Sequence, residues 1–195
     1  MQRIIHYTVK AQDSGLTILA FLRKNGFSKH ILTTMKRSEH AILLNGLPAF
    51  GRTVLKEQDV LKILVPEEVG PEGSIIPVKI PLDILYEDED LLVLNKPAGL
   101  AMHPMSTDLA APNLAGALVA YLGEGTVPHF VSRLDKGTSG LLIAAKSGYV
   151  HELLHRALHS EELRREYRAL ALGRVTPPRG VIDAPIARAE GSIVK

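Results

Sequence analysis

The chain contains no cysteine and no tryptophan in 195 residues, and aromatic residues make up only 5%. Without cysteine there can be no disulfide bond or thiolate metal site, and a reducing, cytoplasmic setting is the expected location. No apolar run approaches the length of a membrane span, and the first ten residues lack the apolar core of a signal peptide. We therefore expect no membrane partner. The 46% of hydrophobic and 23% of charged residues are typical of a globular fold.

Charge is unevenly distributed along the chain, although the formal net charge is only +2. Residues 1–80 contain eleven Lys/Arg and seven Asp/Glu, whereas residues 81–135 contain two and eight. Residues 136–195 are basic again, with ten Lys/Arg and six Asp/Glu. A basic first segment favours a polyanionic partner, but an ordinary solvated surface can give the same counts.

The first segment, residues 1–66, is expected to form a small α/β domain. Apolar residues between Leu16 and Leu22 crowd one face of a helix, and Gly26 ends the run. Ser28 is the expected N-cap of a second helix over residues 29–38. This helix turns its apolar residues inward and leaves its basic residues outward.

Asn45-Gly46 separates two short apolar runs and predicts a hairpin, because both residues tolerate positive φ. A strand is predicted over 60–65. This order, with "LLNG" and "VLKEQDVLKI", resembles the S4 RNA-binding domain, although Gly15-Leu16-Thr17 stands where that family often has an arginine. The resemblance assigns RNA phosphate contacts to Lys29, Lys36 and Arg37 of the second helix and to Arg52 just past the hairpin. A basic, solvated helix is the alternative.

Residues 67–81 are rich in proline, glycine and glutamate and predict a semi-rigid linker. Residues 82–195 are expected to form a second domain. Its elements indicate an α+β class with a mixed or antiparallel sheet rather than a series of βαβ units. We predict strands over 84–86, 91–96, 141–145, 166–173 and 181–182, and helices over 113–122 and 149–158.

Asp135 is the first candidate for chemistry, because a carboxylate can serve as nucleophile, base or electrostatic stabiliser at a glycosidic carbon. Arg133 lies two residues away and Lys136 is adjacent, and a neighbouring cation favours the ionised carboxylate. In an extended segment Arg133 and Asp135 share one face. An ordinary loop ion pair would give the same pattern.

Three segments resemble motifs of the RluA-type pseudouridine synthases, in that family's order. "RLDKGTSGLLIAAKS" is similar to its R-L-D motif with a T-S-G-L turn and an apolar strand. "ILYEDEDLLVLNKPAGLAMHP" is similar to its N-K-P-x-G and H-P segment, and "EYRALALG" to its Y-x-A motif. An S4-like domain in front of these motifs is a common arrangement in the family. The resemblance covers residues 15–188.

This resemblance implies an enzyme that isomerises uridine to pseudouridine in RNA, without a cofactor. Asp135 matches the catalytic aspartate and Arg133 an arginine that fills the space of the flipped nucleotide. Tyr167 matches the tyrosine that packs on the target base, although a core tyrosine is an alternative. Ribosomal RNA is the expected partner, with transfer RNA as the alternative. Loop-shaping roles are expected for Lys96, Pro97, Gly99, Thr138 and Gly140.

Four histidines stand out without completing a metal motif. His103 precedes a proline and has no second ligand at metal spacing. His151, His155 and His159 have i, i+4, i+8 spacing but lack the glutamate of an H-E-x-x-H site. We expect a loop hydrogen-bonding role for the first, a basic helix face for the others, and no bound metal.

The chain departs from the family pattern in two places. Ser132 stands where the family often has histidine before R-L-D. The family's catalytic domain also continues through a T-G-R-x-H-Q-I-R type segment, whose arginine pairs with the aspartate, whereas this chain stops at "GSIVK". We therefore expect a C-terminally truncated form that is weak or inactive alone. The alternatives are a non-catalytic S4-type RNA-binding protein and a carboxylate-based nucleoside hydrolase.

Overall fold

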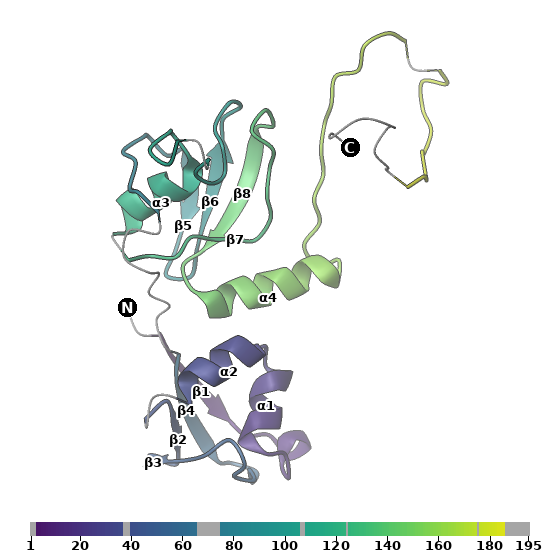
Figure 1. Ribbon diagram of the computed structural model, residues 1–195. Helices are drawn as coiled ribbons and strands as arrows, with labels where there is room; N and C mark the ends of the chain where they lie inside the picture. The colour runs from purple at the N-terminus through teal and green to yellow at the C-terminus, as the bar shows by residue number, and fades with distance from the viewer. Residues whose placement is uncertain are drawn as a thin grey trace. The chain divides into compact units, whose positions relative to one another are not determined.

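The computed structural model describes residues 3–36, 40–65, 75–105, 108–123, 125–174 and 176–185. The chain divides into two compact units, Met1–Leu163 and Arg164–Lys195. The described helices and strands all lie in the first unit, which is an α+β structure with two antiparallel sheets (Figure 1). None of the described helices has the length and apolarity needed to span a bilayer.

The first sheet has the strand order β1-β4-β2-β3 and two short helices (Figure 1). Its strands are β1 (Arg3–Thr8), β2 (Ile42–Leu44), β3 (Leu47–Pro48) and β4 (Val60–Val65), and its helices are α1 (Ile18–Lys24) and α2 (Lys29–Met35). The predicted hairpin is confirmed: Leu44 pairs with Leu47 across Asn45 and Gly46. Both turn residues have positive φ, at 51° and 84°.

The start of each short helix is set by a side-chain cap. The Ser28 hydroxyl accepts a hydrogen bond from the Ile31 amide at 3.3 Å, which confirms the predicted N-cap. Thr17 accepts from the Ala20 amide at 3.2 Å in the same way. The buried faces of α1 and α2 pack with Leu61 and Ile63 of β4 in one hydrophobic core.

The second sheet has the strand order β5-β6-β8-β7 and carries the motif residues. Its strands are β5 (Ile84–Glu87), β6 (Leu91–Lys96), β7 (His129–Phe130) and β8 (Gly140–Ala145), and helix α3 (Leu114–Leu122) packs on it. All pairings among these strands are antiparallel. The predicted strands at 84–86, 91–96 and 141–145 and the predicted helix after Asn113 are therefore confirmed.

Helix α4 (Gly148–His159) follows β8 and confirms the helix predicted over 149–158. Its first turn contributes Tyr149 and Val150 to the hydrophobic core of the first sheet. The Tyr149 ring lies 4.6 Å from Phe27, centroid to centroid, and its hydroxyl lies 3.2 Å from that of Tyr7. The predicted domain boundaries stay a prediction, because most of the linker, residues 66–74, lies outside the described residues.

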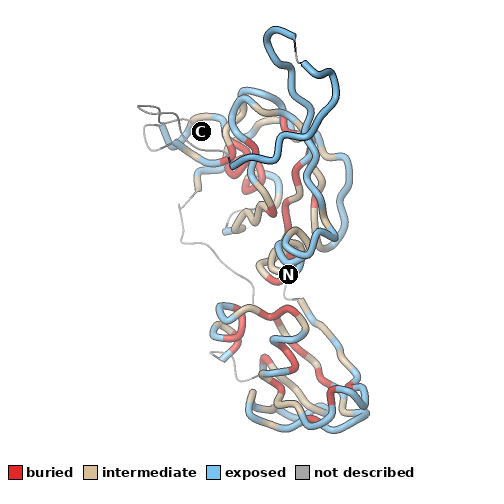
Figure 2. The backbone as a smooth tube through the Cα atoms, turned by 90° about the vertical axis from the view of Figure 1, so that its right-hand side faces the viewer, coloured by how far each residue is buried: buried red, intermediate tan, exposed pale blue. Residues whose placement is uncertain are grey.

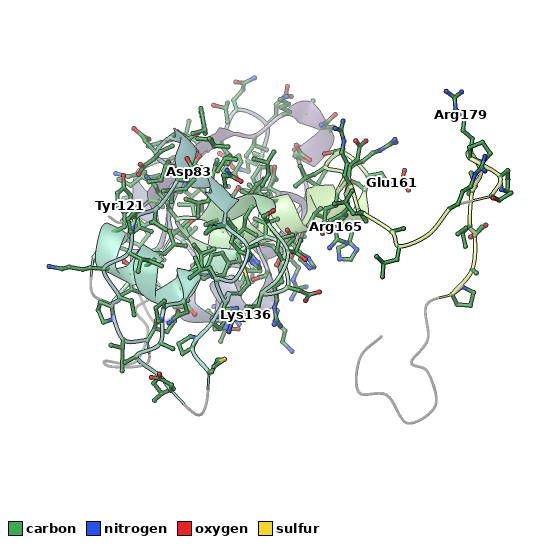
Figure 3. The ribbon with its side chains drawn as sticks, turned by 90° about the horizontal axis from the view of Figure 1, so that it is seen from above. Asp83, Tyr121, Lys136, Glu161, Arg165 and Arg179 are labelled. Atoms are coloured by element: carbon green, nitrogen blue, oxygen red, sulfur yellow. The ribbon has the colours of Figure 1, made fainter. Side chains whose placement is uncertain are left out.

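The strands predicted over 166–173 and 181–182 are wrong. Residues 164–174 and 176–185 form neither helix nor strand, and Figure 2 shows them exposed throughout. Leu170 and Leu172, which belong to this alternating segment, are fully exposed. An alternating pattern forms a strand only where a neighbour pairs with its backbone, and no described strand does so here. Arg165 and Arg179, labelled in Figure 3, belong to this segment.

Gly116 in α3 lies where the chain before β5 crosses the helix. Its carbonyl accepts a hydrogen bond from the Val78 amide at 3.0 Å. A Cβ added at Gly116 would lie 2.6 Å from the Ile76 carbonyl oxygen and 2.9 Å from a Val78 methyl carbon. Close approach of the two backbones therefore depends on glycine at this position.

We expect Gly116→Ala to destabilise the fold by about 1–3 kcal/mol, because overpacking outweighs the gain of about 1 kcal/mol that alanine brings to a helix. Urea unfolding measures the change. Gly137→Ala is the control, since a Cβ at Gly137 meets nothing within 4 Å. A Gly116→Ala variant as stable as the starting protein would contradict the close approach.

Candidate active site

Two loops distant in sequence meet at one edge of the second sheet because of the pairing between β6 and β8. In this antiparallel register Lys96, the last residue of β6, lies opposite Gly140, the first residue of β8. The loop after β6 and the loop before β8 therefore emerge side by side. The Gly99 amide donates to the Lys136 carbonyl at 2.7 Å, which joins the two loops directly.

The buried Lys96 side chain hydrogen-bonds to both loops at this junction. Its side chain is only 1% exposed, and its ammonium group donates to three carbonyl oxygens. These belong to Pro97 at 2.9 Å, Leu100 at 2.8 Å and Lys136 at 3.3 Å. A lysine ammonium has three protons to donate, so the three carbonyls match its capacity. The predicted loop-shaping role of Lys96 has a physical basis in these contacts.

Glycines make the two loops possible. Gly99 has φ 88° and Gly140 has φ 134°, both in the region that L side chains rarely adopt. Thr138 contributes through its backbone, since its amide donates to the Asp135 carbonyl at 3.0 Å and closes the turn. The positions predicted to shape the loop therefore lie together around the Asp135 turn.

Asp135 and Arg133 are exposed on either side of Leu134, which is 8% exposed and packs in the core of the second sheet. Burial of Leu134 anchors the segment and presents its two charged neighbours to solvent. The pKa of Lys96 lies below its usual value, because burial lowers it by more than the Asp135 carboxylate raises it. The carboxylate is thus close enough to Lys96 to stabilise its charge.

A pocket of about 190 Å³ opens beside this turn. Its wall includes Gly99, His103, Met105, Asn113 and Lys136, and Lys136 is labelled in Figure 3. The His103 ring packs edge to face on the Phe130 ring, with the two ring centroids 5.6 Å apart. Burial lowers the pKa of His103, and the nearby Arg133 guanidinium lowers it further, so the neutral imidazole is favoured.

The start of α3 forms a wall of this pocket that the sequence did not predict. Asn113 is 1% exposed and caps the helix, accepting from the Gly116 amide at 2.7 Å. The Leu114 amide donates to the Ala101 carbonyl at 2.8 Å, which ties the helix start to the loop after β6. The capping signal predicted where the helix begins, but nothing local in the sequence indicated its neighbour.

The other predicted site residues lie elsewhere. Lys29 and Lys36 are exposed at the two ends of α2, and Arg52 is exposed after the hairpin. Arg37 lies outside the described residues. Tyr167 belongs to the second unit and is 61% exposed, and its predicted packing on the target base stays a prediction. Among the described residues, no group of three or more His, Asp or Glu side chains is arranged to hold a metal ion.

Replacing Asp135 with asparagine should lower the pKa of Lys96 further, because burial would then act without the compensating carboxylate. The folded-state pKa already lies below the usual 10.5. At a pH between the folded-state pKa of Lys96 and 10.5, the unfolded chain binds more protons than the folded chain, so the free energy of unfolding rises with pH. Asp135→Asn should extend this pH range to lower values, because it lowers the folded-state pKa. An NMR titration of the Lys96 side chain measures the shift. Glu89→Gln is the control, and an unchanged Lys96 pKa in Asp135→Asn would contradict the proximity.

Comparison with known proteins identifies the family. The model of the RNA pseudouridylate synthase family matches residues 90–193, which include both loops of this site. An uncharacterized RNA pseudouridine synthase of Bacillus subtilis, YjbO, is 34% identical over 92% of this chain. Ribosomal large subunit pseudouridine synthase D of Escherichia coli (strain K12) is 38% identical over 65% of it.

The chain spans 64% and 39% of the lengths of these two relatives. A solved structure, human RNA pseudouridylate synthase domain containing 4, is 30% identical with a TM-score of 0.31, and the match covers 40% of this chain and 30% of that one. The family model, which matches more than half of the residues, decides the assignment. The chain belongs to the RNA pseudouridylate synthase family.

Proposed function

We propose that the protein isomerises uridine to pseudouridine in RNA, with Asp135 as the catalytic carboxylate. The observation that carries this proposal is the junction at the sheet edge, where Gly99 and Lys96 bind the Lys136 carbonyl directly after Asp135. Hydrogen bonds thereby join two motifs that lie about 40 residues apart, and the exposed carboxylate lies on one of the joined loops. Family membership supports the same reaction.

The reaction exchanges one bond at the ribose C1′ for another. The bond from C1′ to N1 of uracil breaks, the detached base rotates, and C1′ bonds to C5, whose proton moves to N1 in net terms. A carboxylate can assist by attacking C1′ or by assisting loss of a ribose proton. Both routes require a carboxylate that can reach the ribose, and the Asp135 side chain is exposed.

Arg133 and Tyr167 complete the proposed site. A base within a helix must leave its stack before the reaction, at a cost of a few kcal/mol. The planar Arg133 guanidinium, exposed two residues from Asp135, is suited to fill the gap. Tyr167 is proposed to pack on the detached uracil.

The first sheet and its helices are proposed to bind RNA as an S4-like domain. Exposed Lys29, Lys36 and Arg52 support phosphate contacts, together with the predicted Arg37. Ribosomal RNA is the proposed substrate, with transfer RNA as the alternative. The name of the Escherichia coli relative, which refers to the large ribosomal subunit, supports this choice.

Mapping pseudouridines in ribosomal and transfer RNA from cells with and without the gene tests the proposal. One or more sites should disappear without the gene and return when it is restored. Tritium release from 5-tritiated uridine in RNA tests the reaction directly. RNA binding with no isomerisation would instead support a non-catalytic RNA-binding protein, and release of free uracil would support a hydrolase.

A further inference from the structure

An exposed aromatic side chain stands beside an apolar pocket in the first sheet, far in sequence from the Asp135 turn. Phe50 follows β3 and is 72% exposed. It lines a pocket of about 190 Å³ together with residues of α1, α2 and the hairpin. The apolar floor comes from both helices and the rim carries a cation: Leu19, Leu22, Leu32, Met35 and Lys36.

Backbone hydrogen bonds hold Phe50 in this position. The Thr53 amide donates to the Phe50 carbonyl at 2.9 Å and closes a turn. The Leu19 amide donates to the Gly51 carbonyl at 2.8 Å, which ties the turn to α1. The phenyl ring is therefore carried on a constrained backbone, although most of its surface faces water. An isolated exposed apolar residue is ordinary, but one that borders an apolar pocket indicates a binding site.

The charge around the pocket indicates what binds there. From Asp13 to Asp59 there are seven Lys/Arg and four Asp/Glu, and Asp13 pairs with one of these cations, Lys24, at 2.6 Å. Lys36 lines the pocket and Arg52 lies two residues after Phe50, and both are exposed. Cations around an apolar, aromatic surface match an unpaired nucleotide, whose base stacks on a ring while its phosphates meet the cations.

We infer that this pocket binds one unpaired base of the RNA substrate, stacked on Phe50, with the flanking phosphates on Lys36 and Arg52. The inference rests on the proposed function only in taking RNA as the partner. Bases within a duplex are already stacked and cannot enter the pocket. The site therefore selects RNA with a single-stranded nucleotide, through residues that do not belong to the Asp135 turn.

Fluorescence anisotropy with the full chain tests the inference, using a labelled oligouridine and a labelled RNA duplex. Phe50→Ala should weaken binding of the single strand about tenfold and leave duplex binding unchanged. Phe50→Trp should retain the affinity. Leu47→Ala is the matched control, because Leu47 lies in the same hairpin and is also 72% exposed but does not line the pocket. Lys36→Gln should weaken binding of both the oligouridine and the duplex, and it should reduce the dependence of the binding affinity on salt concentration.

Unchanged binding of oligouridine by Phe50→Ala, or an equal loss for the duplex, would overturn the inference. No RNA binding by the unmodified chain would overturn it as well. Loss of self-association in Phe50→Ala with intact RNA binding would mean that a second copy occupies the pocket. Thermal unfolding verifies that the variants are folded. If oligouridine binding depends on Phe50 but no pseudouridine forms, this inference holds and the proposed isomerisation is wrong.

Discussion

Asp135→Asn is expected to lower the rate of pseudouridine formation by about 10²–10⁴-fold, the range over which a positioned acid or base contributes to catalysis. Asparagine keeps the shape of the side chain but cannot attack a carbon as a carboxylate does or accept a proton at neutral pH. The Asp135 side chain is exposed, so its replacement should leave the fold intact. Quantifying pseudouridine in substrate RNA over time, with the protein as its gene encodes it, measures the loss.

Glu89→Gln serves as the control for Asp135→Asn. Glu89 is an exposed carboxylate of the same sheet, in the turn between β5 and β6, and the change is equally conservative. It should leave the rate unchanged. RNA binding should be similar in both variants, because neither residue belongs to the proposed phosphate contacts. Full activity in Asp135→Asn would remove Asp135 from the catalytic role and assign the reaction to another residue.

Lys96→Met is expected to destabilise the fold by about 3 kcal/mol or more. Methionine fills a similar volume but cannot donate hydrogen bonds, so three carbonyls at the loop junction lose the ammonium as a donor. The Lys136 carbonyl keeps the Gly99 amide, whereas the other two lose the donor described for them. Each polar group left unpaired in a buried site costs about 1–3 kcal/mol. Relief from burying the charged ammonium offsets part of this cost. Urea unfolding, monitored by circular dichroism, measures the change in the free energy of unfolding.

Lys146→Met is the matched control for Lys96→Met. Lys146 also donates two short hydrogen bonds, to the Glu87 carboxylate at 2.7 Å and the Asp88 carbonyl at 2.6 Å. Its side chain is 23% exposed, so water can replace these partners and the loss should stay within about 1 kcal/mol. Equal losses in the two variants would show that burial of Lys96 does not govern the junction.

Local signals in the sequence predicted most of the elements. The caps at Ser28 and Asn113 marked the starts of α2 and α3, because an N-cap acts within three residues of the helix start. Asn45-Gly46 predicted the hairpin for a similarly local reason, its positive φ angles. The short strand β7 was missed, since two residues carry no periodicity and it forms only by pairing with β8.

The candidate site was predicted in part. Motif order identified Asp135, Lys96 and Gly99 as belonging to one site, and the structure joins their loops. The pocket wall at Asn113 was not predicted, because its contact with Ala101 depends on how α3 packs. The predicted packing of Tyr167 on the target base stays a prediction.

The sequence by itself determined the helix starts, the hairpin, the apolar faces and the family motifs, all of which depend on residues a few positions apart. Only the tertiary structure decided that Lys96 lies opposite Gly140 and is buried under the Asp135 turn. It also decided that the alternating residues from 166 to 173 form no strand. The physical reason is shared: strand pairing satisfies backbone groups of segments distant in sequence, and no local pattern specifies the partner.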